Sequence, residues 1–509
     1  MILAGLTTAL AGAGLAQALV GSRLVAAFAR RSRAAWLQPG IRPAVTVLKP
    51  LHGDEPLLEE ALSTVCRQDY PEFQIVFGVQ DITDRAVAVV HRLQKRFPDV
   101  DIVLVADPGL HGENRKVGNL INMLPAARHD ILVIADSDVH VRPDYLDRLV
   151  AALQVQGVGL VTTLYAGLPV VSPVPGLGQT RSDPIVSGRI ASDPIASCHT
   201  ASDPIASCHT ASDPIESWPG LARPPTTCGA EPGKVLDSPA KPGHDPTTNA
   251  SARTNRGATL AYPTSLTRPA SIGLPARLGA TQITHGFLPG ALLSRALGRQ
   301  DCLGATMCLR RDDLQRLGGF HSLVDHLADD NVLGRRIIGL GLRVALAGTI
   351  VLTTVPEPDL KALFRHELRW ARTIRALEPA GFAASVLQYP LAWALLTVVL
   401  TGGALWSIGL FLIAWVLRAV AALAVDSALA PLWTNNEHAS AAQRTSNDNA
   451  ALAFCCPVWL LPLRDAFSVA VMLTSYGGRR VDWRGQSLQA GAPPPITMTR
   501  PPTEGNHAR

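Results

Sequence analysis

The chain has few charged residues for its length, and its cysteines lack the spacing of a metal site. Charged residues make up 17% of the 509 residues and apolar residues 47%, a balance shifted toward membrane proteins. The net charge of +5 is mild and spread along the chain, which argues against a nucleic-acid partner. The eight cysteines are scattered, so they indicate neither a disulfide framework nor a zinc site, and we expect a reducing compartment.

Apolar residues are also scarce in one long internal segment, where the sequence becomes repetitive. Ser-Asp-Pro-Ile recurs there at a regular spacing, and residues 191–200 and 201–210 are identical. A proline in every copy opposes a regular helix or a central strand, and too few apolar residues remain to form a core. We therefore expect residues 172–273 to be a disordered, repeat-containing insertion in a surface loop. A binding tract for some partner is the alternative.

An uncharged run begins the chain. Residues 2–20 carry no charge, and four arginines follow them between residues 21 and 33. A signal peptide carries its positive charges before the apolar run rather than after it. We therefore expect residues 1–30 to form an uncleaved membrane anchor whose basic flank faces the cytoplasm. A buried core helix is the alternative.

Further apolar runs lie toward the other end of the chain. Residues 386–425 are interrupted by Gly402-Gly403, which fits two short spans joined at that point. The run over 450–473 contains Arg464-Asp465, so it fits a helix in the membrane interface or packed on the domain better than a span. We expect three or four membrane elements in all. Residues 386–475 are grouped as C-terminal membrane or interfacial helices, and 476–509 as a polar tail.

The region between the anchor and the insertion alternates two kinds of pattern. We expect strands at 44–48, 73–79, 101–106 and 131–135, and helices at 55–66, 85–97 and 116–124. This rhythm predicts an α/β fold with a doubly wound, mainly parallel sheet. We assign 40–171 to one half of the domain and 274–380 to the other.

Two acidic motifs end strands of this expected sheet. Asp136-Ser137-Asp138 follows the apolar run 131–135, and two carboxylates one residue apart can hold a hard divalent cation that binds a diphosphate. A plain turn is the alternative, because Asp and Ser favour turns. Asp81 ends the strand 73–79 at the same edge, where it either contacts a nucleotide or caps the next helix.

Three further motifs contain charged residues. Lys116 lies where a polar loop enters a helix, which suits a phosphate or an ordinary solvated loop. Asp330 begins a helix, either as a cap or as a general base that takes the proton of an acceptor hydroxyl. Arg369 and Trp370 precede the second apolar region. They fit diphosphate binding and stacking on a sugar, or a basic juxtamembrane helix.

Taken in order, these motifs resemble those of the processive and lipid-modifying inverting glycosyltransferases. The resemblance is closest to the ceramide glucosyltransferase-like family, and within it to the hopanoid-biosynthesis-associated branch. The segments that carry it, across about residues 43–375, are Val79-Gln80-Asp81, Asn114–Leu120, Asp136-Ser137-Asp138, Gly304–Cys308, Leu317–Phe320, Ala328-Asp329-Asp330 and His366–Trp370. The chain departs from the family in the insertion and at His366, where the family has Gln or Arg.

The resemblance implies a GT-A type nucleotide-sugar transferase domain with membrane helices at both ends. Residues 40–171 would be its nucleotide-sugar-binding half, and 274–380 its acceptor and catalytic half. It also implies roles for single residues. The catalytic residues would be Asp330, Arg369 and Trp370; the donor-binding residues Asp81, Lys116, Asn119, Asp136 and His366; and the ligands of Mg²⁺ or Mn²⁺ Asp136 and Asp138.

The implied reaction is an inverting transfer of a sugar from UDP-N-acetylglucosamine or UDP-glucose to a lipid hydroxyl. The acceptor would be a hopanoid polyol such as bacteriohopanetetrol, with ceramide as the alternative. The implied location is the bacterial inner (cytoplasmic) membrane, with the catalytic domain in the cytoplasm. A polysaccharide synthase-like enzyme and an inactive, degenerate transferase are further alternatives. The small number of spans disfavours the first, and the intact acids disfavour the second.

Overall fold

The computed structural model describes residues 1–34, 41–170, 272–434, 452–478, 480–483 and 486–489. The expected insertion at 172–273 lies outside the described residues except for its last two positions. Regular structure resumes with helix α6 (Leu274–Thr281), as the sequence predicts. In the expected polar tail, strands β9 (Arg480–Trp483) and β10 (Gln486–Gln489) pair antiparallel, and most of the remainder lies outside the described residues.

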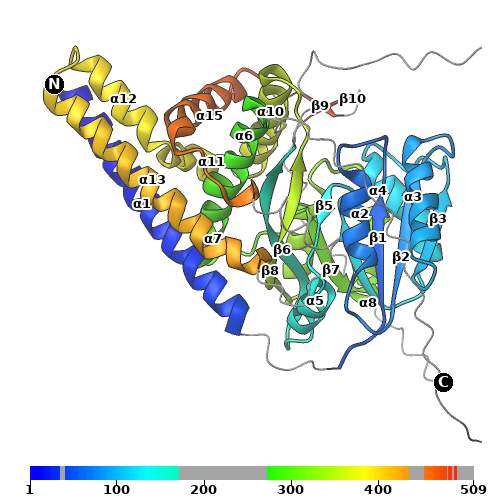
Figure 1. The fold of residues 1–509 in the computed structure, drawn as a ribbon. Coiled ribbons are helices and arrows are strands. Elements are labelled where there is room, and N and C mark those ends of the chain that lie inside the picture. Colours follow the sequence, from blue (N-terminus) through cyan, green and yellow to red (C-terminus); the bar gives the residue numbers. More distant parts are fainter. Residues whose placement is uncertain (35–40, 171–271, 435–451, 479, 484–485, 490–509) are drawn as a thin grey trace, which may run out of the picture. The chain divides into compact units, whose positions relative to one another are not determined.

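An eight-stranded sheet, in the order β3-β2-β1-β4-β7-β6-β8-β5, forms the centre of the domain (Figure 1). Its strands are β1 (Val45–Pro50), β2 (Phe73–Val79), β3 (Asp101–Ala106), β4 (Ile131–Ala135), β5 (Val139–His140), β6 (Val158–Pro169), β7 (Thr306–Arg310) and β8 (Arg343–Val355). From β3 to β4 all neighbours are parallel, whereas β7 runs antiparallel to both β4 and β6. The prediction of a doubly wound, mainly parallel sheet is confirmed. The antiparallel neighbours all lie in the second half, at β7 and β5, whereas β6 and β8 are parallel. The alternation of strands and helices that predicts parallel neighbours ends at β6, because a run of helices precedes β7.

Helices cover both faces of the parallel strands. Successive side chains of a strand point to opposite faces, so each strand contributes apolar side chains to both layers. The helices are α2 (Leu58–Cys66), α3 (Arg85–Arg96) and α5 (Tyr145–Leu153) on one face, and α4 (Arg115–Met123) and α9 (Asp329–Gly339) on the other. Val47 of β1 packs under the first group and its neighbour Leu48 under the second. Both residues are fully buried, so the two hydrophobic layers fix the sheet from both sides.

Apolar helices lie at both ends of the chain. Within the described residues, three helices are long and apolar enough to cross a membrane: Ile2–Arg33, Leu405–Trp433 and Val458–Ser475. The pair Pro379–Gln388 and Pro390–Leu400, bent by 67°, would make a fourth if it is one span. These three or four candidates agree in number with the three or four membrane elements that the sequence predicts.

Helices α12 (Pro390–Leu400) and α13 (Leu405–Thr434) form the expected hairpin at Gly402-Gly403. Both glycines have positive φ, at +63° and +79°, a conformation that side chains with a Cβ rarely adopt. The second arm continues past the predicted end at residue 425. At eleven residues, α12 is roughly 16 Å long, less than the roughly 30 Å of a bilayer core.

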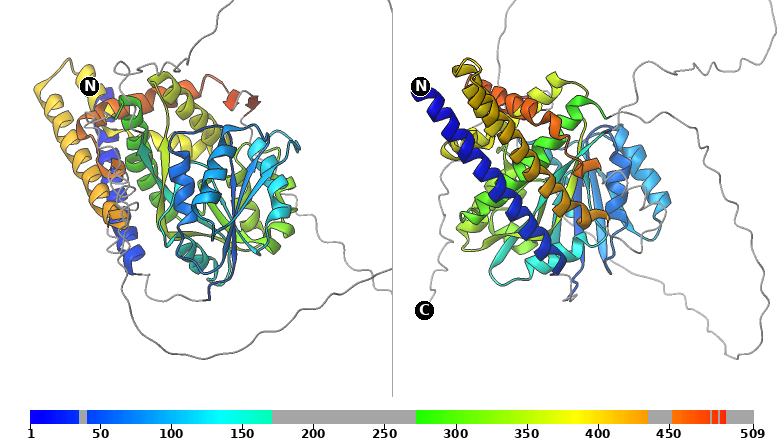
Figure 2. Two further views of the ribbon diagram at one scale, coloured as in Figure 1. Left: turned by 45° about the vertical axis from the view of Figure 1, so that its right-hand side comes forward. Right: turned by 60° about the vertical axis from the view of Figure 1, so that its left-hand side comes forward.

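The long helices α1 (Ile2–Ala34) and α13 lie side by side (Figures 1 and 2). Their C-terminal parts, including Phe28 and Leu429, pack on the β6–β8 region of the sheet in one hydrophobic cluster. Their N-terminal parts instead expose large apolar side chains such as Leu3 and Trp406. The exposed apolar side chains extend from Ile2 to Val20 of α1 and from Leu405 to Leu423 of α13, so the apolar surface that suits a lipid environment covers the parts of both helices that precede their contacts with the sheet.

Candidate active site

The turn Asp136–Asp138 follows β4 at the edge of the sheet and is fixed by hydrogen bonds to Lys49 and Glu55. Lys49, at the end of β1, is fully buried, and its Nζ donates to the carbonyl oxygen of Asp136 at 2.8 Å. Burial lowers the pKa of Lys49 to about 8, with the nearby Asp138 and Asp136 carboxylates opposing the shift. The Ser137 hydroxyl donates to Glu55 at 2.5 Å. A side chain on each side thus fixes the direction in which the two acids point.

The two acids of this turn have different surroundings. Thr353 of β8 donates its hydroxyl to Asp138 Oδ2 at 2.5 Å, whereas the Asp136 side chain is 38% exposed. Burial and the neighbouring Asp136 carboxylate raise the pKa of Asp138 to about 6. The two carboxylates repel each other, although Lys116 lies 2.7 Å from Asp136 and Lys49 is close by. A cation at this turn would relieve the repulsion.

The turn fits a divalent cation that takes only part of its coordination from protein. Among the described residues, no group of three or more His, Cys, Asp or Glu side chains is arranged to hold a metal. Mg²⁺ is commonly bound by one or two carboxylates, with phosphate oxygens and waters completing its octahedron. Asp136 and Asp138 offer that pair of carboxylates.

Lys116, in the first turn of α4, connects the acids of the two halves of the domain. Its Nζ lies 2.7 Å from Asp136 Oδ1 and 3.8 Å from Asp329 Oδ2. Although burial disfavours its charge, these two carboxylates raise the pKa of Lys116 above its ordinary value. The structure thus places a permanent cation beside Asp136, where it can bind an anionic ligand.

Asp330 lies in the first turn of α9 and is not its cap, because Ala328 occupies the cap position. Burial and the neighbouring Asp329 raise the pKa of Asp330 to about 7, with Lys116 opposing the shift. A Cβ placed on Gly304 would lie 2.8 Å from Asp330 Oδ2, so glycine leaves the space that this carboxyl occupies. A carboxyl with a pKa near neutrality suits general base catalysis.

Tyr165 of β6 responds to the charges of both halves of the site. Burial raises the pKa of its hydroxyl, and Asp330, Asp136 and Asp138 all raise it further. Tyr165 and Trp370 of α10 (Leu360–Leu377) pack against the same small hydrophobic cluster, formed by Ala280, Ile283 and Val355. The acids that follow β4 and the acid of α9 thus act on one tyrosine, which shares an apolar cluster with the tryptophan of α10.

The segment His366–Trp370 occupies the middle of α10. His366 Nδ1 pairs with Glu357, and its ring meets the ring of Trp370 edge-on at 4.5 Å. The imidazole thus has a defined orientation beside the tryptophan, although the family has Gln or Arg at this position. Arg369 directly precedes Trp370 on the same helix.

Two residues of the donor-binding prediction lie in different settings. Asp81 is exposed and accepts hydrogen bonds from the Thr83 N–H at 2.8 Å and the Thr83 hydroxyl at 2.7 Å, which lower its pKa. The cap of α3 is Asp84 instead. Asn119 is buried, and its amide donates to the carbonyl oxygen of Gly78 at 2.8 Å. The structure thus places Asn119 between α4 and β2, and its role in donor binding stays a prediction.

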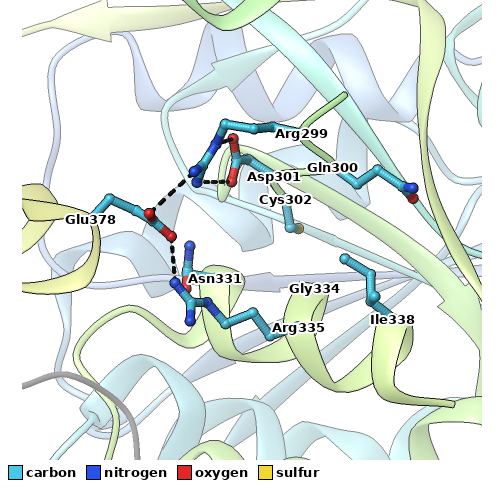
Figure 3. Close-up of a pocket in the computed structure, with 9 residues that line it drawn as sticks. All are labelled: Arg299, Gln300, Asp301, Cys302, Asn331, Gly334, Arg335, Ile338 and Glu378. Carbon is cyan, nitrogen blue, oxygen red and sulfur yellow. Dashed lines mark hydrogen bonds and ion pairs between the residues drawn. The ribbon is translucent and has the colours of Figure 1, made fainter. Parts of the chain in front are cut away.

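A cavity of about 170 Å³ lies beside α9 and is lined by residues that include Cys302, Asn331 and Gly334 (Figure 3). In the lining, Glu378 accepts from Arg335 of α9 at 2.5 Å and from Arg299 at 3.1 Å. Glu378 directly follows α10, so these bonds tie the end of α10 to α9. The lining does not include the acids described above, so we do not assign a donor to this cavity.

Several residues of the site were not predicted from the sequence. Lys49 could have been found, because it is a charged residue at the end of an apolar strand. Glu55, Thr353 and Tyr165 could not, because their contacts with the acids arise only from the arrangement of the strands.

An α/β domain with paired acids at its sheet edge, flanked by apolar helices, has the architecture of a GT-A type glycosyltransferase. The model of glycosyl transferase family 21 matches residues 6–176 and 254–494. The chain belongs to this family, and the resemblance seen in the motifs is confirmed at that level.

Known proteins resemble this chain over shorter stretches. Ceramide glucosyltransferase of Komagataella phaffii is 38% identical over 113 residues, which make up 21% of this chain and 22% of that protein. Ceramide glucosyltransferase 1 of Caenorhabditis elegans is 31% identical over 102 residues, or 20% of this chain and 22% of that protein. The matched segment thus spans about 22% of these relatives. A mannosyltransferase from Pyrobaculum calidifontis, solved with GDP-Man and Mn²⁺, aligns with a TM-score of 0.38 at 17% identity, covering 92% of this chain and 99% of that one.

Proposed function

We propose that this protein is a membrane-bound, inverting glycosyltransferase that moves a sugar from a UDP-sugar to a lipid hydroxyl. The observation that carries the proposal is that Lys116 lies 2.7 Å from Asp136 and 3.8 Å from Asp329, the neighbour of Asp330, which brings the acids after β4 close to the acids of α9. Apolar helices packed on the same domain would hold a lipid acceptor beside the donor, which raises its effective concentration. We place the catalytic domain on the cytoplasmic side of a bacterial inner membrane.

In this proposal the donor diphosphate lies at the turn after β4. Mg²⁺ or Mn²⁺ held by Asp136 and Asp138 would offset the charge that builds on the leaving diphosphate. Lys116, already within 2.7 Å of Asp136, would bind a diphosphate oxygen from the α4 side. Arg369 would bind the diphosphate from α10, Trp370 would stack on the sugar, and Asp81 would contact the nucleotide.

Asp330 would supply the base for a single displacement. The acceptor oxygen forms a bond to the anomeric carbon as the bond from that carbon to the diphosphate breaks. The acceptor proton passes to the Asp330 carboxylate. Asp329 is less suited to this role, because it already pairs with Lys116 and accepts from Asn114. The assignment therefore separates the base on α9 from the metal-binding acids after β4.

For the donor we propose UDP-N-acetylglucosamine or UDP-glucose, and for the acceptor a hopanoid polyol such as bacteriohopanetetrol. Ceramide is the second acceptor, and the names of the similar proteins favour it. Lipid mass spectrometry of cells with and without the protein separates the two. A missing hexosamine-bearing hopanoid supports the first acceptor and a missing glucosylceramide the second, whereas an unchanged lipid profile contradicts both.

Asp330→Asn tests the assignment of the base. Transfer by the purified protein should collapse, while UDP binding measured by calorimetry with Mn²⁺ should persist, because the amide keeps the shape of the side chain and loses only the base. Asp312→Asn, on an exposed carboxylate of the neighbouring helix over Arg311–Arg316, is the matched control. Transfer that survives Asp330→Asn would remove Asp330 from the mechanism.

A further inference from the structure

A buried ion pair joins the C-terminal helix α15 (Leu461–Ser475) to the middle of α10. Arg464 of α15 is 2% exposed and Glu367 of α10 is 8% exposed. The guanidinium donates through Nη1 to Glu367 Oε1 at 2.8 Å and through Nη2 to Oε2 at 2.6 Å. Two parallel bonds fix the direction of both side chains as well as their separation.

Arg464 also binds the segment that lies between the two helices and the sheet. Its Nη1 donates to the carbonyl oxygen of Leu278 in α6 at 3.2 Å, and its Nη2 donates to the Ser468 hydroxyl at 2.8 Å. Ser468 in turn donates to Gln282 at 3.2 Å, in the π-helical segment Gln282–Phe287. The planar guanidinium presents its donors in a rigid fork, so these bonds set α15, α10 and α6 relative to one another.

Helix α15 has two unlike faces. Its charged and small polar residues Arg464, Asp465, Ser468 and Ser475 are buried, whereas Leu463 and Leu473 are 46% and 67% exposed. Arg464 and Ser468 face α10 and the α6 segment, whereas Asp465 accepts from the Leu391 N–H of α12 at 3.0 Å. Polar contacts thus fix α15 to the domain on one side and to the apolar hairpin on another.

Glu367 lies within the His366–Trp370 segment, one residue after His366 and three before Trp370. A helix is rigid over one turn, so a shift of Glu367 carries these neighbours with it. Trp370 packs against the cluster that also holds Tyr165, which stacks on Phe287 at 4.6 Å. The position of Trp370 therefore depends on the same contacts that Arg464 holds in place.

We propose that Arg464 is a positioning residue that fixes the His366–Trp370 segment through Glu367. This inference rests on the proposed function of that segment. Buried ion pairs are seldom needed for stability, since replacing both partners by apolar residues is often neutral or stabilising. The pair sets the rotation of α10 about its axis, and an apolar pair of similar volume would leave that rotation free.

The test compares Arg464→Met and Glu367→Met, singly and together. Each single variant leaves one buried charge without its partner, so its Tm should fall. The double variant should regain most of the Tm of the wild type, because no uncompensated charge remains. Its kcat should nevertheless stay about tenfold or more below that of the wild type, because small displacements in an active site are costly, while the KM for the nucleotide sugar changes little. If the pair only stabilises the fold, kcat will return together with Tm, and the proposal is wrong.

A matched control is the two-pronged pair between Arg42 and Asp147, at 2.7 Å and 2.5 Å, which joins the segment before β1 to α5. The double replacement of this pair by methionine should leave kcat per folded molecule unchanged. Hydrogen exchange gives a readout that does not depend on activity. Amides of residues 360–377 should exchange faster in the Arg464/Glu367 double variant and at the wild-type rate in the control. Unchanged exchange overturns the positioning role even if the protein proves to have no transferase activity, so the two proposals fail separately.

Discussion

At the scale of single residues, the charge state of the site depends on a few carboxyls whose pKa values are raised by their surroundings. Asp138 and Asp330 have pKa values raised to about 6 and about 7, in both cases through burial and through the adjacent acid. Lys116 offsets part of this repulsion at Asp330. A divalent cation bound to Asp136 and Asp138 would add positive charge on that side of the site.

Transfer should therefore depend on pH through Asp330. A base must be deprotonated, so kcat/KM, which reports the pKa values of the free enzyme, should rise with pH and level off above about 7. A kcat/KM that stays constant from one unit below this pKa to one unit above it would contradict the assignment.

The stability of the fold should have the opposite dependence on pH. Between the ordinary carboxyl pKa of 3.8 and about 7, the folded protein binds the proton more tightly than the unfolded chain does. The contribution of Asp330 to the free energy of unfolding should thus fall as pH rises through this window. In a series of Tm measurements at increasing pH, this fall should be absent from the Asp330→Asn variant.

Gly304→Ala should impair catalysis with little effect on folding. The new Cβ would lie 2.8 Å from Asp330 Oδ2, so the carboxyl must move. We expect kcat to fall by about ten- to hundredfold, the range that small displacements in active sites produce. Gly12→Ala in α1 is the control, since a Cβ there meets nothing within 4 Å. Equal kcat values in the two variants would show that the Asp330 carboxyl has another position available.

At the scale of elements, helix α4 is fixed by the residue before it. The Asn114 side chain accepts from the Val117 N–H at 3.1 Å and donates to the carbonyl oxygen of His326 at 2.8 Å. One side chain thus caps the helix that carries Lys116 and ties it to the loop before α9. The donor-side and acceptor-side helices are positioned together as a result.

Asn114→Ala should lower the free energy of unfolding by about 1–2 kcal/mol, the usual cost of a lost helix cap. The loss of the bond to His326 should also weaken transfer, because it releases α9. Asp359→Ala removes the cap of α10, an exposed bond to the Ala362 N–H at 2.7 Å, and serves for comparison. Urea unfolding in detergent gives the stability of both variants. A smaller loss in Asn114→Ala than in Asp359→Ala would contradict the double role of Asn114.

At the scale of the whole molecule, a long segment interrupts the domain between β6 and α6. The two elements that flank it pack against each other: a Cβ on Gly167 would lie 2.6 Å from Ala280, and the Gly167 N–H donates to Thr284 at 3.0 Å. These contacts do not involve the intervening segment. The domain should therefore assemble without it.

Replacing residues 172–271 by a short Gly-Ser linker should leave the protein folded and active. Closing a shorter loop costs less entropy, but each halving of its length changes the free energy by only about 0.6 kcal/mol. We therefore expect a nearly unchanged Tm and a kcat at or above that of the full chain. If only the shortened protein is active, the segment inhibits the enzyme. If the shortened protein fails to fold, our prediction of a dispensable disordered insertion is wrong.

Local sequence was sufficient for most elements of the first half of the domain. The strands at 73–79, 101–106 and 131–135 were predicted residue for residue, because apolar runs bounded by polar turns reveal a buried strand. The apolar helices and the hairpin at Gly402-Gly403 followed from length, composition and glycine placement. The acids Asp136 and Asp138 were also accessible to sequence, since they follow a recognisable strand.

Tertiary structure alone decided which distant residues meet. The antiparallel placement of β7 between β4 and β6, the position of Lys116 between Asp136 and Asp329, and the packing of Asn119 against β2 were not determined by any local pattern. Glu367 and Arg464 are separated by 97 residues, yet share two hydrogen bonds. The period of side chains along a helix or strand is a local property and can be read from the chain. The order of strands and the partners of buried charges depend on how whole elements pack, and only the folded domain determines them.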